Sequence, residues 1–109
     1  MAADDSSQSD QSGGRSRRTI RFFPDHARSP LWESGSWNYI VFPEELGLSE
    51  SLSRDILDWT AYWNSHFDPL DGWKSEESHQ RSQAEGDAIV ERLRAEIRSF
   101  ADVVDERSV

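Results

Sequence analysis

The residues of this chain that could do acid–base or metal chemistry gather in two short segments. His66, Asp68 and Asp71 are close together in the sequence, and Asp25 and His26 are neighbours further upstream. Imidazole and carboxylate groups are common general acids, general bases and zinc ligands. Their spacing matches neither H-E-x-x-H nor an EF-hand loop, and a carboxylate pair needs a pocket that separates its pKa values. We therefore expect no metal site, no cofactor and no catalytic residue.

Motifs for nucleophilic attack or phosphate binding are also missing from the sequence. Ser65 stands next to His66 but lacks the G-x-S-x-G frame of a nucleophile elbow. The chain has no cysteine, which removes disulfides, thiolate metal sites and a cysteine nucleophile. An enzyme is therefore disfavoured. A small-molecule or metal-dependent enzyme, with His66 and a carboxylate pair in a dry cleft, is kept as the third hypothesis.

The charge of the chain favours some partners over others. The formal net charge is -9, from 21 acidic and 12 basic residues. Residues 1–18 are balanced, so the excess of acid lies in residues 19–109. Such a domain repels phosphate backbones, which argues against nucleic-acid binding. It would attract a basic protein if the carboxylates cluster, although acidity can also serve solubility alone.

Acidic and aromatic side chains in the loops and on the first helix are predicted to form a partner-binding surface. Aromatic anchors beside carboxylates are typical of contacts with a basic protein. The same residues would equally suit a solvated exterior. The candidates for partner binding are Trp32, Glu33, Glu44, Glu45, Asp55, Asp58 and Tyr62.

An apolar stripe from Leu48 to Phe67 is the strongest structural signal in the chain. Its members recur at steps of three and four residues and fall within roughly a 100° arc of a helix. This spacing predicts an amphipathic helix that is capped by Ser49 and ends near Phe67, because Pro69 disfavours helical geometry just beyond. The stripe consists of Leu48, Leu52, Ile56, Trp59, Trp63 and Phe67.

A second amphipathic helix is predicted after the connector DPLDGWK. It should start near Ser75 or Ser78 and run to about Phe100, or as far as Val104. Because the connector is short, the second helix should return antiparallel to the first.

Gly86 is the unusual residue of this second helix. It lies on the apolar stripe although glycine costs about 1 kcal/mol relative to alanine in a helix interior. We therefore expect a bulky group, Trp59 or Trp63, to pack against its bare backbone.

Two strands are predicted before the first helix. Thr19–Phe23 and Ser36–Phe42 are rich in β-branched and aromatic residues, and residues 24–35 between them read as a loop. Pairing the two strands gives an antiparallel ribbon, which is not stable alone and needs helices packed on it. The expected fold class is α+β, with a short two-stranded antiparallel ribbon packed on an antiparallel helical hairpin.

The expected domain organisation is a single small domain behind a polar tail. Residues 1–18 contain almost no apolar side chains and should be disordered. No apolar run approaches the roughly 18 residues that span a membrane, and the N-terminus lacks an apolar signal region, so a cytoplasmic protein is expected. The predicted parts are a tail at 1–18, the domain at 19–104 and a frayed C-terminus at 105–109.

Several segments resemble a family of small, acidic, uncharacterised bacterial proteins. The resemblance covers roughly residues 30–98 and is carried by PLW, FPEELGLSESLSRDILDWTAYWNSHFDPLDGW and EGDAIVERLRAEI. It brings no established activity with it. Size and acidity are similar to those of immunity proteins and antitoxins, which is an analogy between classes.

The leading functional hypothesis is a non-catalytic protein-binding module, an immunity or antitoxin-like inhibitor of a basic partner. The alternative is a structural or homo-oligomeric protein that associates through its aromatic face, if one small sheet cannot cover the stripe. Either a monomer or a homodimer is compatible with the sequence, and neither a nucleic acid nor a membrane is expected as a partner.

Overall fold

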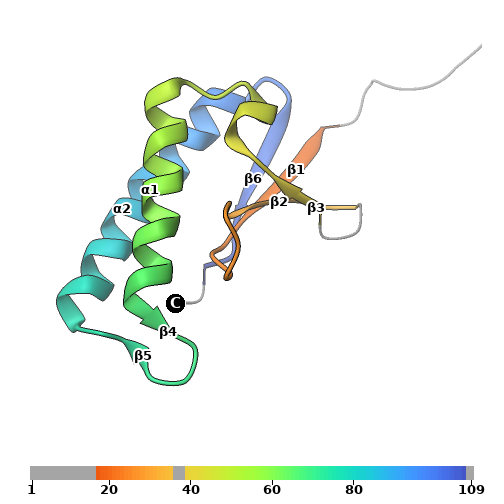
Figure 1. The fold of residues 1–109 in the computed structure, drawn as a ribbon. Helices are drawn as coiled ribbons and strands as arrows, with labels where there is room; N and C mark the ends of the chain where they lie inside the picture. The colour runs from red at the N-terminus through yellow and green to blue at the C-terminus, as the bar shows by residue number, and fades with distance from the viewer. Residues whose placement is uncertain (1–16, 36–38, 108–109) are drawn as a thin grey trace, which may run out of the picture.

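The computed structural model describes residues 17–35 and 39–107, and the predicted disordered tail therefore lies almost wholly outside the described residues. Within them the chain alternates short strands with two long helices (Figure 1). The elements are β1 (Arg18–Phe22), β2 (Leu31–Glu33), β3 (Tyr39–Val41), the 3-10 helix η1 (Pro43–Leu46), α1 (Glu50–His66), β4 (Phe67–Asp68), β5 (Gly72–Trp73), α2 (Glu76–Ile97) and β6 (Ala101–Asp105).

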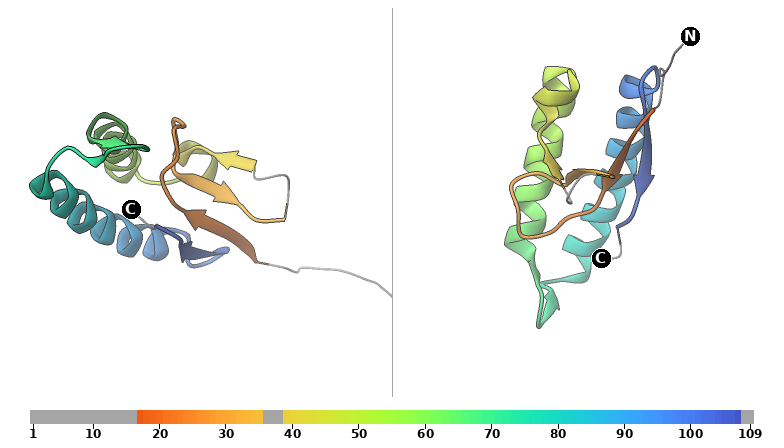
Figure 2. Two further views of the ribbon diagram at one scale, coloured as in Figure 1. Left: turned by 90° about the horizontal axis from the view of Figure 1, so that it is seen from below. Right: turned by 90° about the vertical axis from the view of Figure 1, so that its right-hand side faces the viewer.

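The main sheet is mixed and has four strands in the order β3-β2-β1-β6. β2 pairs antiparallel with both β1 and β3, whereas β6 runs parallel to β1. Both helices lie on one side of this sheet (Figures 1 and 2). The α+β class and the antiparallel helical hairpin are confirmed. The two-stranded ribbon is wrong, because β2 separates the two strands that were expected to pair.

The sequence pattern predicted a loop where β2 forms and the end of a helix where β6 forms. β2 falls inside the predicted loop 24–35; its three residues follow Pro30 and are too few to show an alternating pattern. β6 falls where the second helix was expected to continue. α2 instead ends at Ile97, since Val103 and Val104 are β-branched and join a parallel strand that the local pattern does not reveal.

The beginnings of the two long helices agree with the prediction. The Ser49 hydroxyl accepts a hydrogen bond from the Leu52 N–H, and the Ser75 hydroxyl accepts one from the Ser78 N–H. α1 then ends at His66, and the short strands β4 and β5 turn the chain back into α2. Each helix therefore begins with a serine cap, which satisfies a backbone donor that lacks a partner within the helix.

Trp59 stands at the centre of the core that the two helices share with the sheet. Only 2% of it is exposed, and its ring centroid lies 5.0 Å from that of Phe22 in β1. Its indole N–H donates to the Ser82 carbonyl of α2 over 2.8 Å. The side chains around it come from both helices and all four main strands: Ile20, Leu31, Val41, Leu52, Ile56, Ile89, Val90, Leu93, Ile97, Ala101 and Val103.

Side chains from α1 and from the C-terminal segment pack tightly against α2 at Gly86. A Cβ on this residue would lie 3.3 Å from the Trp59 indole nitrogen and would collide with the guanidinium of Arg107. The predicted packing of a tryptophan against its bare backbone is therefore confirmed for Trp59. The second neighbour, Arg107, comes from the end of the chain and was not anticipated.

Residues 105–107, which the sequence placed in a frayed end, are part of the fold. The Glu106 N–H donates to the Phe22 carbonyl over 2.9 Å. The side chain of Arg107 is 8% exposed and binds Asp87 at 2.6 Å and Asp105 at 2.8 Å. Arg107 thus fastens the C-terminal segment to α2, and its neighbour Asp105 holds a pKa below the usual range because it accepts hydrogen bonds from that guanidinium.

Replacing Trp59 with alanine should destabilise the domain severely. The change removes a fully packed ring and the hydrogen bond to Ser82, and truncating a buried large aromatic costs about 3–5 kcal/mol. Urea denaturation followed by circular dichroism measures the loss. A variant with the midpoint of the unmodified chain would mean that the core is assigned wrongly.

Gly86→Ala should lower stability although alanine is the better helix former. The methyl group has to displace the held guanidinium of Arg107, and we expect a net loss of about 1–2 kcal/mol in thermal and urea unfolding. The matched control is the same change in an Arg107→Ala background, where the loss should shrink or reverse. An equal loss in both backgrounds would show that Arg107 is not the obstacle.

Candidate functional site

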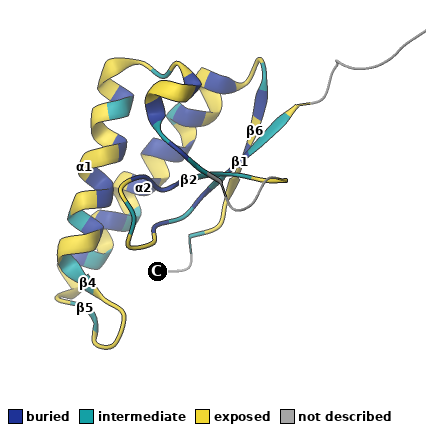
Figure 3. Cartoon of the chain, turned by 45° about the vertical axis from the view of Figure 1, so that its right-hand side comes forward, coloured by how far each residue is buried: buried dark blue, intermediate teal, exposed yellow. Residues whose placement is uncertain are grey.

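A groove runs between α1 and α2 on the face of the helix pair that points away from the sheet. Its volume is about 370 Å³, and much of α1 is coloured as exposed in Figure 3. Three of the predicted partner-binding residues meet here, namely Asp55, Asp58 and Tyr62. We call this the helical groove; its lining residues are Asp55, Asp58, Trp59, Tyr62, Arg81, Glu85, Ala88, Ile89 and Arg92.

The cations of the helical groove are already neutralised by its own carboxylates. Arg92 binds Asp55 over 2.6 Å across the two helices, and Arg81 binds Glu85 over 3.0 Å along α2. Asp58 has no ion-pair partner among the residues that the structure describes. Because these pairs are exposed, each adds only about 0.2–1 kcal/mol to stability. The unpaired carboxylate of Asp58 therefore leaves the groove with one net negative charge.

Tyr62 forms the aromatic wall of the helical groove toward the C-terminal end of α1. Its ring stacks on the His66 imidazole, with centroids 3.9 Å apart, and the Arg81 guanidinium lies 4.6 Å above its centre. These contacts fix the orientation of the ring, so Tyr62 can meet a partner without losing much rotational freedom.

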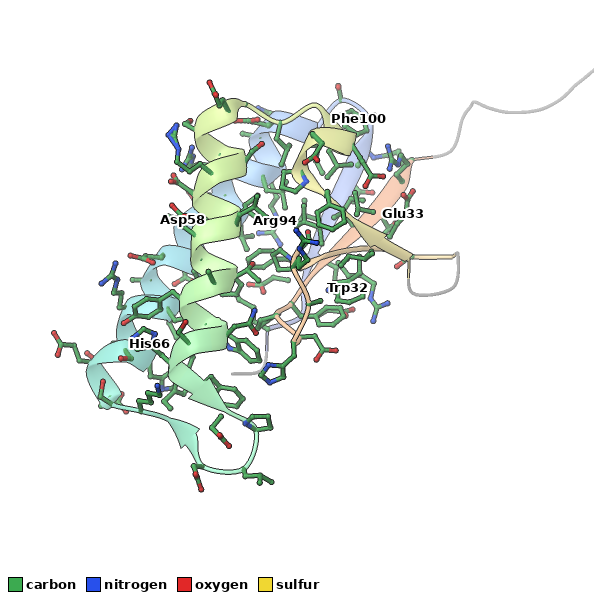
Figure 4. All side chains as sticks on the ribbon, in the orientation of Figure 1. Trp32, Glu33, Asp58, His66, Arg94 and Phe100 are labelled. Carbon is green, nitrogen blue, oxygen red and sulfur yellow. The ribbon has the colours of Figure 1, made fainter. Side chains whose placement is uncertain are left out.

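Trp32 and Glu33 lie on the sheet, away from the helical groove. Figure 4 shows both beside the strands, whereas Asp58 projects from the opposite side of α1. The Trp32 ring stacks on Phe23 with centroids 5.1 Å apart. Glu33 accepts two hydrogen bonds from Arg18 at 2.8 Å, which holds the pKa of Glu33 below its usual range.

Glu44 and Glu45 lie in η1, between the sheet and α1. Glu44 lines a second hollow, of about 600 Å³, with Arg28 and Leu57 on the other side of α1. The carboxylate of Glu45 accepts a hydrogen bond from the Phe42 N–H over 3.1 Å. The structure thus brings together three of the seven candidates and distributes the other four over the sheet and η1, where their contact with a partner stays a prediction.

The histidines and carboxylates at the end of α1 do not form a metal-binding geometry in the described part of the chain. The His66 Nδ1 contacts the Tyr62 carbonyl at 2.8 Å, and Asp68 accepts hydrogen bonds from two backbone N–H groups of its own turn. Among residues 17–35 and 39–107, no three histidine or carboxylate side chains are grouped to hold a metal ion.

The α2 side of the helical groove was missed by sequence reasoning. From the sequence, no role in partner binding was predicted for Arg81, Glu85 or Arg92. Together with Ala88, these residues repeat every three or four positions along α2 beside the apolar stripe. That spacing could have indicated a second polar face opposite Asp55 and Asp58.

None of the described helices is long and apolar enough to cross a membrane. Comparison with protein families matches residues 18–104 to a model described as "Serratia CdiI immunity protein-like". The match begins at the first residue of β1 and reaches into β6, so it spans every helix and strand of the fold. Among curated proteins none matches this chain.

Asp58→Asn should leave the fold unharmed. Because Asp58 is exposed and unpaired in the described structure, we expect its replacement to change the free energy of unfolding by no more than about 0.5 kcal/mol. Chemical denaturation measures this. A much larger loss would reveal a structural role for the carboxylate and would disqualify the variant as a probe of binding.

Proposed function

The chain belongs to the Serratia CdiI immunity protein-like family, and we propose that it is itself an immunity protein that binds a toxin and neutralises it without catalysis. The observation that carries the proposal is the extent of the family match, which runs from Arg18 to Val104 and covers the folded chain rather than a short motif. An inhibitor of this kind needs a stable surface of the right shape and charge, and no reactive group.

A basic toxin fits the charge of the chain. The net charge is -9, and an acidic protein attracts a basic partner over distances of about one Debye length, roughly 8–10 Å in physiological salt. Such attraction mainly accelerates association and selects the partner. We propose the cytoplasm as the place of action, since a chain without cysteine needs no oxidising compartment.

The helical groove is the contact that we assign to the toxin. A lysine or arginine side chain would lay its aliphatic part on Ala88 and Ile89 and bring its charge to Asp58. Tyr62 supplies an aromatic surface next to it, as is common at the centre of protein interfaces. The paired cations Arg81 and Arg92 do not oppose such a ligand, because each already has a carboxylate partner.

The homo-oligomeric alternative has less support. It assumed an aromatic stripe too large for one small sheet, but Trp59 and Trp63 are only 2% and 3% exposed within a single chain. Leu57, Leu70 and Val104 are the large apolar side chains that stay exposed among the described residues, and they come from α1, the β4–β5 turn and β6. They do not form a shared face.

The experiment is growth rescue with candidate toxin domains encoded in the genome of the same organism, tested one at a time. Co-expression of the unmodified chain should restore growth of cells that make the toxin, and the purified proteins should bind more weakly as salt is raised. Asp58→Lys should weaken binding at least tenfold, because it places a cation where the toxin presents one.

The matched control is Glu91→Gln, which removes an exposed carboxylate of α2 outside the helical groove. It should bind the toxin as the unmodified chain does. Failure of the unmodified chain to bind or to rescue growth would refute the immunity function. Equal binding by Asp58→Lys would instead refute the helical groove as the contact.

A further inference from the structure

The turn between β4 and β5 projects from the end of the helix pair and presents an exposed leucine. We call residues 68–71 the hairpin tip. It forms the lower extremity of the molecule in Figure 1 and is coloured as exposed in Figure 3. Leu70 at its centre is 93% exposed, compared with 39% for Leu57. A single exposed leucine is common on protein surfaces, so the argument depends on how this one is held.

Hydrogen bonds make the hairpin tip a defined turn. One carboxylate oxygen of Asp68 accepts from the Leu70 N–H at 2.7 Å and from the Asp71 N–H at 3.0 Å. These bonds lower the pKa of Asp68, which therefore stays ionised at neutral pH. Gly72 follows with a φ of 82°, a conformation that a side chain would disfavour. Leu70 is thus presented at a fixed place.

A cluster of aromatic rings connects the hairpin tip to the two helices. Phe67 and Trp73 are paired across β4 and β5, and their ring centroids lie 5.5 Å apart. Phe67 also stacks on Trp63 at 4.8 Å, and Trp73 on His79 at 5.2 Å. The tip is therefore tied to both helices, and a partner that binds it pays little for ordering the turn.

The same end of the fold contains two buried donors that are not satisfied. Neither the Trp63 nor the Trp73 indole N–H has a hydrogen-bond acceptor among the described residues. A buried donor without an acceptor costs about 1–3 kcal/mol. Both indoles pack against Phe67, so this cluster of aromatic rings lies directly next to the tip.

We propose that the hairpin tip is a second contact with the toxin, in which Leu70 enters an apolar pocket bordered by basic side chains. The bordering cations would pair with the carboxylates of Asp68 and Asp71, neither of which has an ion-pair partner in the described part of the chain. This inference rests on the proposed immunity function and specifies where and how the toxin is held.

The hairpin tip continues the surface of the helical groove. Asp58 and His66 lie on the same side of α1 (Figure 4) and are separated by about 12 Å along the helix axis. Tyr62 lies between them and stacks on His66, and β4 follows directly. A specific interface involves about 20–30 residues on each partner. The nine residues that line the helical groove are therefore only part of such an interface. A toxin seated in the groove is therefore expected to reach the tip.

The test is titration calorimetry of Leu70 variants with the toxin domain that the unmodified chain neutralises in the growth assay. Leu70→Ala should weaken binding about tenfold, because the pocket loses its apolar contact. Leu70→Asp should weaken it further, since it leaves a charge facing an apolar pocket. Both variants should keep the melting temperature of the unmodified chain, because a side chain that is 93% exposed contributes little to the core.

The control is Leu57→Ala, which removes an exposed leucine from the other side of α1 and should bind normally. If Leu70→Asp binds within twofold of the unmodified chain, the hairpin tip is not a contact, while the immunity function stands. If the unmodified chain itself does not bind, the immunity function fails and the assignment of the tip fails with it.

Discussion

The close approach of Trp59 and Arg107 to Gly86 is the constraint on which the structure depends. The tryptophan reaches from α1, packs on Phe22 and donates to the Ser82 carbonyl of α2. Arg107 approaches from the C-terminal segment and lies over the Phe22 ring, with its charge balanced by two aspartates. A Cβ at Gly86 would collide with the Arg107 guanidinium and lie 3.3 Å from the Trp59 indole nitrogen. One point of contact thus joins both helices, β1 and the end of the chain.

This packing also decides which residues face a partner. With Trp59 turned toward the core, neighbours at helical spacing on the flank of the stripe, such as Asp55, Asp58 and Tyr62, must face the outer side. The return of α2 sets Arg81, Glu85 and Arg92 opposite them. The helical groove is therefore a consequence of the core, and its charge pattern can vary without disturbing the fold.

Local patterns predicted the local structure well. Ser49 as a cap, the apolar stripe of α1, the antiparallel return after Pro69 and the crowded position of Gly86 all follow from spacing and side-chain shape. The sheet was predicted poorly, because β2 has three residues and β6 becomes a strand only through its pairing with a segment far away in the sequence. The seven candidates for partner binding show the same limit. The three candidates on α1 lie together in the helical groove because helical spacing sets them side by side. Trp32 and Glu44 lie elsewhere, which only the tertiary arrangement reveals.

The most direct test of the proposed mode of inhibition is the amide NMR spectrum of the labelled chain, recorded alone and bound to the toxin domain that it neutralises in the growth assay. The account predicts large shift changes along the outer face of α1 from Asp55 to His66, on the facing residues of α2 and in residues 68–71. The open face of the sheet, marked by Trp32 and Ile40, should change little. Changes confined to the sheet, with the groove and the tip unaffected, would contradict the account.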